Sequence, residues 1–225
     1  MPAHSNDIPA EKALFDAADA LRGSVESAVY KHLVLGLVFL KYVSDAFATQ
    51  RSKLDARTRE PDGDWFTDDE EEREAILEDR DEYASDNVFW IPREARWDAI
   101  LALGSQPDLG VQIDRALDDI EQENAPLKGI LPKIYAGAAM SPETLGRLVS
   151  IIARVGFGDD PAHARDVLGR VYEYFIKEFA RSEGHRGGEF FTPGPVARLL
   201  VEMLQPFQGR TSTVPAPAPS SRAAT

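Results

Sequence analysis

Most informative for the fold is the stretch Leu33-Val34-Leu35-Gly36-Leu37-Val38-Phe39-Leu40, an unbroken apolar run within a chain of 225 residues. The segment around it repeats apolar side chains at helical spacing, and neighbouring apolar residues widen that face. The positions on the main face are Val25, Val29, Leu33, Leu37 and Leu40. A helix that is apolar on most sides is a buried one. The sequence therefore predicts a buried helix from near Ser24 towards Leu54, and the apolar run is too short for a membrane span.

Helical spacing continues in most of the remaining chain. Thr67 precedes a run of acidic residues and resembles a helix N-cap, and Ser141-Pro142-Glu143-Thr144 combines an N-cap with a proline at the first helical position. Glycine, aspartate and proline cluster at residues 156–161, which is the best candidate for a domain boundary. We expect an all-α fold up to Arg210. The expected helices cover residues 10–21, 24–54, 97–101, 109–124, 141–152, 167–179 and 195–204.

Composition limits the classes of function that the chain can have. It has no cysteine, which excludes disulfides, thiolate zinc sites and cysteine nucleophiles and is typical of a cytoplasmic protein. Residues 60–86 carry 14 acidic and 2 basic side chains, a net charge of −12 out of the total of −13. This run is either a solvated helix or loop, or a local repulsive element. Strong DNA binding by this chain alone is not expected, because affinity for DNA rests on neutralising phosphates.

The N-terminal residues 1–7 are polar, and they lack the basic start and apolar run of a secretion signal. We therefore expect neither secretion nor a membrane location.

The best candidate for a functional site is the segment Gly187-Gly188-Glu189-Phe190-Phe191-Thr192-Pro193. It joins a glycine-rich loop to two aromatic rings and to a helix expected from Pro195 to Leu204, which Thr192 is placed to cap. Ring faces, free backbone N–H groups and the positive end of a helix dipole suit a planar base and a carboxylate. The alternative interpretation is an ordinary loop whose aromatic rings pack into the core.

The same segment carries a resemblance to a known family. Glu189-Phe190-Phe191-Thr192-Pro193 resembles the Phe/Tyr-Thr-Pro signature that precedes the catalytic core of N6-adenine DNA methyltransferases. From about residue 10 to residue 210, the chain resembles the methylation subunit of type I restriction–modification systems. Further matching segments occur in the family's order. They are Tyr30-Lys31-His32, Phe39-Leu40-Lys41-Tyr42-Val43-Ser44-Asp45, Phe89-Trp90-Ile91-Pro92, Leu127-Lys128-Gly129-Ile130-Leu131-Pro132-Lys133, and Leu168-Gly169-Arg170-Val171-Tyr172-Glu173-Tyr174-Phe175.

The resemblance implies a division of the chain into three parts. Residues 8–157 would form an N-terminal helical bundle, and residues 161–210 would form the leading helices of a truncated α/β methyltransferase domain that uses S-adenosylmethionine. Residues 211–225 would form a separate tail. The resemblance also implies which residues line the cofactor pocket: Glu189, Phe190, Phe191, Thr192, Pro193 and Gly194.

The resemblance further implies an activity and partners. The family transfers a methyl group from S-adenosylmethionine to adenine N6 in DNA, which requires the target base to be flipped out of the duplex. Its members act in the cytoplasm with a DNA specificity subunit, a second methylation subunit and a restriction subunit, assembled around double-stranded DNA. The DNA target sequence is read by the specificity subunit, so this chain does not reveal it.

Two elements of the family's catalytic core are not found in this sequence. The family's core continues with a strand carrying Asp-Pro and a glycine-rich turn that cradles the cofactor, and later with an Asn/Asp-Pro-Pro-Tyr/Phe motif that holds the adenine. This chain has no Pro-Pro pair and no glycine after Gly209. We therefore name no catalytic residue and expect no methyl transfer by this polypeptide alone. The alternatives are a non-catalytic helical module, ending near Val155, that binds the specificity subunit and the DNA complex, and a decayed gene product without a role.

Residues 211–225 differ in character from the rest of the chain. They consist of Thr, Ser, Val, Pro and Ala with one Arg, and they show no apolar periodicity, so we expect them to be disordered. The change falls where the resemblance places the first strand of the core. The tail is therefore either the product of out-of-frame translation or a natural disordered extension.

Other residues give weaker signals. His32 lies on a predicted helix and is expected to be structural, and His163 and His185 lack ligand spacing, so no metal site is expected. The carboxylates at 118, 119, 121 and 123 are expected to form a solvated helix face. The basic side chains beside the glycine-rich loop, Arg181, His185 and Arg186, either meet DNA phosphates in an assembled complex or are simply solvated.

Overall fold

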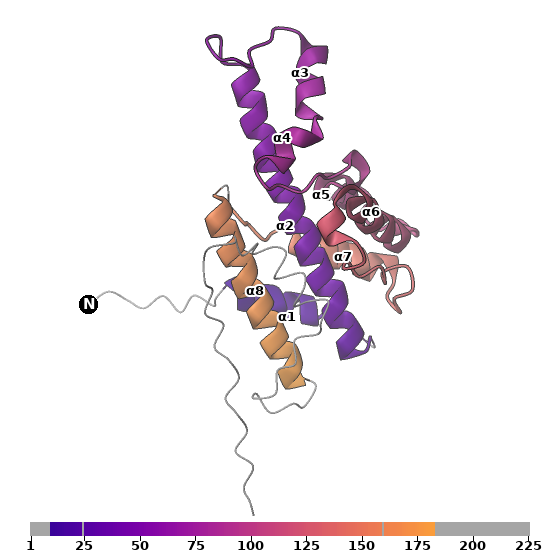
Figure 1. Ribbon diagram of the computed structural model, residues 1–225. Coiled ribbons are helices and arrows are strands. Elements are labelled where there is room, and N and C mark those ends of the chain that lie inside the picture. Colours follow the sequence, from indigo (N-terminus) through magenta and orange to yellow (C-terminus); the bar gives the residue numbers. More distant parts are fainter. Residues whose placement is uncertain (1–9, 24, 159, 183–225) are drawn as a thin grey trace, which may run out of the picture.

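The computed structural model describes residues 10–23, 25–158 and 160–182, and every regular element in these ranges is a helix (Figure 1). The expected all-α fold is therefore confirmed for the part of the chain that the structure describes. The α-helices are α1 (Ala10–Asp19), α2 (Ser27–Thr58), α3 (Glu70–Leu77), α4 (Arg80–Ala84), α5 (Trp97–Ala102), α6 (Leu109–Glu123), α7 (Pro142–Ile152) and α8 (Pro161–Ser182). Two short 3₁₀ turns, η1 (Arg93–Ala95) and η2 (Ala125–Leu127), lie between them.

Helix α2 is the central element. It runs for 32 residues, about 48 Å at the usual rise; α3 lies beside its upper end, and α1, α5, α6, α7 and α8 are arranged around its lower part (Figure 1). The apolar run from Leu33 to Leu40 is buried on all sides, as the sequence predicted. By length and composition α2 is the one helix in the described ranges that could cross a membrane, but 67% of its most apolar window is buried within the protein. The helix therefore serves as the core helix of a bundle.

Helix α8 packs antiparallel along α2, with α1 crossing both near the end of α8 (Figure 1). An aromatic cluster holds this end together. Phe15 of α1 meets Phe175 and Phe179 of α8 edge-to-face at ring-centroid distances of 5.3 and 5.1 Å, and Tyr30 of α2 lies 6.1 Å from Phe179. An ion pair between Glu11 and Arg170 (3.1 Å) joins the same helices at their surface. The first and last described helices thus close one core together.

The start of α8 differs from the sequence prediction. The predicted helix began at residue 167, whereas α8 begins at Pro161. Asp160 accepts a hydrogen bond from the backbone N–H of His163 (2.8 Å), which satisfies one of the free donors of the first turn. That first turn has no large apolar side chain and is exposed except for Ala164, so apolar periodicity did not reveal it. The proposed division at residues 157–161 stays a prediction, although α8 packs on the same core as the helices before it.

At Gly36, which has no side chain, the loop that precedes α7 lies directly against the backbone of α2. The Tyr135 hydroxyl donates to the carbonyl oxygen of Leu33 (2.8 Å), and the Tyr172 hydroxyl of α8 donates to that of Leu35 (2.8 Å). Both tyrosines are buried, and burial raises the pKa of each hydroxyl far above its ordinary value. A side chain at Gly36 would overlap the Tyr135 hydroxyl. The loop and α8 are therefore attached to α2 through its own carbonyl groups.

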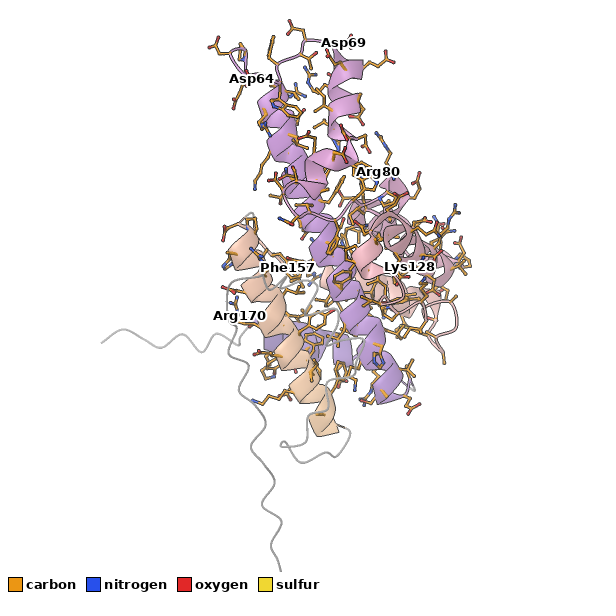
Figure 2. All side chains as sticks on the ribbon, viewed as in Figure 1. Asp64, Asp69, Arg80, Lys128, Phe157 and Arg170 are labelled. Carbon is orange, nitrogen blue, oxygen red and sulfur yellow. The ribbon has the colours of Figure 1, made fainter. Side chains whose placement is uncertain are left out.

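The acidic segment forms an arm, made of the end of α2, the following loop, α3 and α4. Asp64 and Asp69 lie at its far end (Figure 2). Where α3 returns to the bundle, Glu78 contacts Arg51 of α2 (3.5 Å), Arg93 (2.9 Å) and Arg96 (2.9 Å). The acidic run is thus pinned by arginines at its base and exposed at its tip.

Helix α3 begins differently from the prediction. The N-cap is Asp69, whose Oδ1 accepts from the backbone N–H groups of Glu71 (2.8 Å) and Glu72 (3.3 Å). Thr67, the predicted cap, is buried two residues earlier, where its hydroxyl donates to Glu72 (2.6 Å) and accepts from the N–H of Asp69 (3.1 Å). Several acidic residues share this region, and sequence position alone did not distinguish which of them caps the helix.

One carboxylate of α6 departs from the expected solvated face. Glu121 is 5% exposed, accepts from the N–H of Leu131 (2.6 Å) and pairs with Lys133 (2.8 Å). Two turns of helix earlier, Asp114 accepts from the N–H groups of Tyr135 (2.9 Å) and Ala136 (2.8 Å). These carboxylates hold the loop that follows η2, so part of this face is structural rather than solvated.

Candidate functional site

The residues predicted to line a cofactor pocket, Glu189 to Gly194, lie outside the described residues, as do His185, Arg186 and the helix predicted at 195–204. What the structure shows is the element that leads to them. Helix α8 ends at Ser182, seven positions before Glu189, and its last turns are fixed by the aromatic cluster with α1 and α2. The chain therefore enters the predicted cofactor segment from a helix whose position is set by the core.

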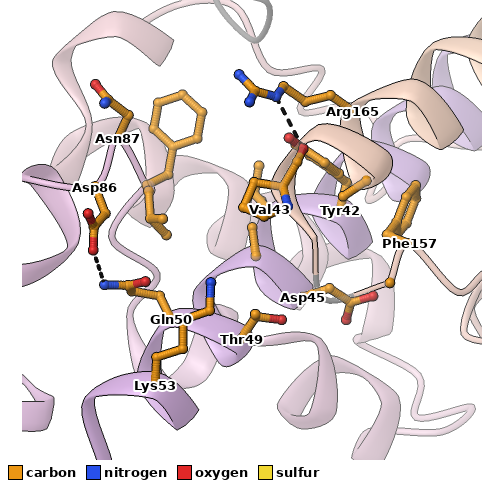
Figure 3. A pocket seen from close by; sticks show the side chains of 16 residues that line it. Tyr42, Val43, Asp45, Thr49, Gln50, Lys53, Asp86, Asn87, Phe157 and Arg165 are labelled. Carbon is orange, nitrogen blue, oxygen red and sulfur yellow. Dashed lines mark hydrogen bonds between the residues drawn. The ribbon is translucent and has the colours of Figure 1, made fainter. Parts of the chain in front are cut away.

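A cavity of about 340 Å³ lies where three segments meet: the middle of α2, the turn after α4 and the start of α8 (Figure 3). These segments are far apart in the sequence, and the packing of α8 on α2 brings them together. The apolar part of the wall includes Val43, Val88, Phe89 and an edge-to-face pair of rings, Tyr42 and Phe157, with centroids 5.4 Å apart. Its volume lies within the range of small-molecule sites, which starts at about 300 Å³.

Polar side chains occupy the rest of the cavity wall. Gln50 donates from its side-chain amide to the carboxylate of Asp86 at one end, where Asn87 adopts a left-handed backbone conformation with φ +56°. Lys53 and Arg165 lie on other sides of the hollow (Figure 3). Arg165 donates from Nε to the carbonyl oxygen of Pro161 (3.1 Å), which uses one of its five donors. The cavity thus offers cations, a carboxylate and amides around an apolar wall.

A buried charge pair sits beside the cavity on α2. Asp45 lines the cavity and accepts from Lys41, one helical turn earlier, and Lys41 is 9% exposed. Burial raises the pKa of Asp45, the bond from Lys41 opposes that rise, and the nearby carboxylate of Asp98 adds to it. Because Lys41 already balances Asp45, the charges left to act on a ligand are those of Lys53, Arg165 and Asp86.

A second, mostly apolar cavity of about 480 Å³ lies between α1, the end of α7 and α8. Leu14, Ile151 and Val167 line it, with the Glu11–Arg170 ion pair at its edge. His163 also lines it, but the described residues contain no group of three or more His, Cys, Asp or Glu side chains placed to hold a metal ion. His32 lies half-buried on α2. The structural interpretation of His32 and the expectation of no metal site at His163 both stay predictions.

Sequence reasoning did not single out the residues of the first cavity. Tyr42 and Asp45 fall in one of the segments that carry the family resemblance, and Phe89 falls in another, but none was assigned a role. No regular spacing links α2, residues 86–89 and residues 157–165. Residues from two segments of the resemblance and from the predicted domain boundary line this cavity, but nothing in the sequence indicated that these three regions meet.

Comparison with known proteins gives the family. The model of the HsdM N-terminal domain matches residues 10–152, more than half of the chain, and the model of the N-6 DNA Methylase matches residues 163–222. The type I restriction enzyme MjaIX methylase subunit of Methanocaldococcus jannaschii is 36% identical over 195 residues, which are 86% of this chain and 35% of the relative. The HindI methylase subunit of Haemophilus influenzae is 40% identical over 139 residues, 53% of this chain and 31% of that protein.

A solved structure agrees with these relatives. The crystal structure of the type I restriction–modification system methyltransferase subunit from Streptococcus thermophilus matches with a TM-score of 0.55 and 26% identity, over 83% of this chain and 41% of that one. The fold is thus that of the helical front part of a DNA methyltransferase subunit. The chain belongs to the family of type I restriction–modification methylation subunits, and it spans about a third of the length of the curated relatives that it matches.

Proposed function

We propose that this chain is the helical front part of a type I methylation subunit, which transfers a methyl group from S-adenosylmethionine to adenine N6 in DNA. The observation that carries the proposal is the order of the two family matches, with the HsdM N-terminal domain at 10–152 followed by the N-6 DNA Methylase at 163–222. The sequence of helix α8 falls in the second match, but the helix packs on α1 and α2, which fall in the first. It would hold the methylase part at a fixed position on the bundle.

The cofactor segment in this proposal is Glu189 to Gly194. S-adenosylmethionine has a planar base and a charged amino-acid part, and the segment supplies two aromatic rings, a glycine and a predicted helix start. These residues would line one wall of the cofactor pocket. The proposal assigns no catalytic residue, because the sequence has no Asn/Asp-Pro-Pro-aromatic motif that would hold the flipped adenine.

Cofactor contact can be tested by ultraviolet crosslinking of radiolabelled S-adenosylmethionine to the full chain. Phe191→Ala should reduce the label on the peptide that contains residues 187–198. Phe66→Ala is the matched control, because Phe66 is an exposed ring (39%) on the acidic arm and should leave the label unchanged. Equal labelling of the two variants would contradict the assignment of this segment.

Activity of the chain alone can be tested with labelled cofactor and unmethylated duplex DNA. We expect no methyl incorporation by the purified chain, while a full-length type I methylation subunit with its specificity subunit serves as the positive control. Incorporation into adenine by the purified chain alone would refute the proposed inactivity.

A second candidate function is a non-catalytic module that binds the specificity subunit within the DNA complex. The closed core favours it, since α1, α2, α7 and α8 bury their apolar faces against one another among the described residues alone. In this function the chain would join the specificity subunit, a second methylation subunit and the restriction subunit on double-stranded DNA in the cytoplasm. Co-elution with a specificity subunit in size-exclusion chromatography would support it, and separate elution at micromolar concentration would contradict it.

A further inference from the structure

The acidic arm ends in an exposed aromatic ring. Phe66 is 39% exposed, and the exposed carboxylates Asp64 and Asp68 lie on either side of it in the chain. Asp64 marks the far end of the arm in Figure 2. Residues 60–86 carry a net charge of −12 out of the total of −13, so the bundle itself is close to neutral. The arm therefore presents an apolar ring within a strongly negative surface.

A groove of opposite character lies between α1, the end of α7 and α8, where the second cavity has a volume of about 480 Å³. Its floor is aliphatic and includes Leu14, Ala17, Ile151, Val155, Val167 and Val171. The ionisable groups that line it are three exposed basic side chains, Arg154, His163 and Arg170, and one carboxylate, Glu11. Glu11 is paired with Arg170 (3.1 Å), whereas Arg154 forms no ion pair with a described residue. The groove therefore combines an apolar floor with an unpaired cation.

We propose that the tip of the acidic arm of one copy of this chain docks into the groove of a second copy. The exposed face of the Phe66 ring would pack on the aliphatic floor, which removes apolar surface of both copies from water. The carboxylates beside the ring would pair with Arg154 and approach His163. Complementary charge of this kind steers the encounter and fixes the register of two surfaces. Because the bundle is close to neutral, it does not repel the approaching arm.

The contact would join two molecules, because the arm cannot reach the groove of its own chain. Asp64 and Asp69 lie at the far end of the arm, whereas Arg170 lies on the bundle below it (Figure 2). Glu78 ties the base of the arm to the bundle through Arg96 (2.9 Å). The two docking surfaces differ, so the contact is heterologous, and a dimer keeps one free arm and one free groove. Further copies can therefore add to either end.

Sedimentation velocity of the full chain tests the association. We expect the average mass to rise beyond that of a dimer between micromolar and millimolar concentration, because a heterologous contact does not stop at two copies. The average mass should fall in about 0.5 M salt, which screens exposed charges. A chain that stays monomeric throughout would overturn the proposal. The inference uses described residues alone and does not depend on the methyl-transfer proposal. Cofactor crosslinking is done at nanomolar concentration, where the chain is monomeric, so Phe66→Ala stays a valid control there.

Two single variants separate the halves of the contact. Phe66→Ser removes the ring and leaves the groove intact, and Arg154→Glu reverses the cation and leaves the arm intact. Each variant alone should associate at least about tenfold more weakly than the wild type. An equimolar mixture contains one intact arm and one intact groove, so it should form dimers with the affinity of the wild type and nothing longer.

Matched controls are available elsewhere on the bundle. Val111→Ser on α6 and Arg147→Glu on α7 make the same kinds of change at exposed positions that do not line the groove, and both should associate as the wild type does. All four changes are at exposed residues, so the helical content measured by circular dichroism should not change. A mixture of Phe66→Ser and Arg154→Glu that stays monomeric would refute the contact, as would single variants that associate like the wild type.

Discussion

Replacing Gly36 with alanine tests whether close approach to α2 determines the packing of the bundle. In the middle of a helix this change normally stabilises a protein by about 1 kcal/mol. Here a Cβ atom would overlap the Tyr135 hydroxyl and lie 2.9 Å from Cγ of Pro132. Overpacking of this kind costs about 1–3 kcal/mol. Displacing Tyr135 also breaks its buried bond to the carbonyl of Leu33, at a further cost of about 1–3 kcal/mol. The expected net loss is about 3 kcal/mol.

The assay is equilibrium unfolding in urea, followed by tryptophan fluorescence. Gly169→Ala is the matched control, because Gly169 also lies within a helix but a Cβ there would meet nothing within 4 Å. We expect the control to be neutral or slightly stabilised, and Gly36→Ala to unfold at a clearly lower urea concentration with the same slope. Adding Tyr135→Phe removes the overlapping hydroxyl and should restore part of the loss. The reasoning fails if Gly36→Ala is as stable as Gly169→Ala.

Two further predictions concern other parts of the core. Burial acts to raise the pKa of Glu121, but bonds from Lys133 and from the Leu131 N–H outweigh it, so the pKa is lowered. The contribution of Glu121 to the free energy of unfolding is therefore complete above the unfolded pKa of about 4.3 and is lost as the pH falls through the folded pKa. Between pH 7 and pH 3, the free energy of unfolding should fall less in Glu121→Gln than in the wild type. An equal fall in the two proteins would contradict this. Phe179→Ala should cost about 3–5 kcal/mol and accelerate hydrogen exchange in α8, since the ring is fully buried against Phe15; exchange in α8 that matches the wild type would show that the aromatic cluster does not hold the helix.

The helices could be predicted where apolar side chains repeat within one segment. Helix α2 follows from the run around Leu37, and α7 follows from the signal at Ser141 and Pro142, where the Ser141 hydroxyl accepts from the N–H of Thr144 (3.2 Å). The first turn of α8 carries little apolar signal and was missed. The burial of Glu121 was also missed, because it depends on a loop ten residues further along the chain that folds back onto α6.

The candidate sites differ in how much the sequence could reveal. The cofactor segment at 189–194 was found because its residues are contiguous and match a family signature, and their assignment stays a prediction because they lie outside the described residues. The cavity beside α2 could not be found in this way. Asp86 and Arg165 are 79 positions apart and come together only through the packing of α8 on α2. Such a site depends on tertiary structure, which periodicity and motifs do not encode directly.

The closure of the core by α8 has a consequence for the chain while it is being synthesised. Helix α2 ends at Thr58, but the ring of Phe179 that covers its start is added 121 residues later. At the usual rate of about 5–20 residues per second, this interval lasts roughly 6 to 24 s. During that time the ribosome carries a segment apolar enough to cross a membrane, and the part of its surface that α8 covers is still exposed. Until α8 leaves the exit tunnel, α2 can be covered only by the helices made before it, such as α5 and α7, which pack on other parts of its surface.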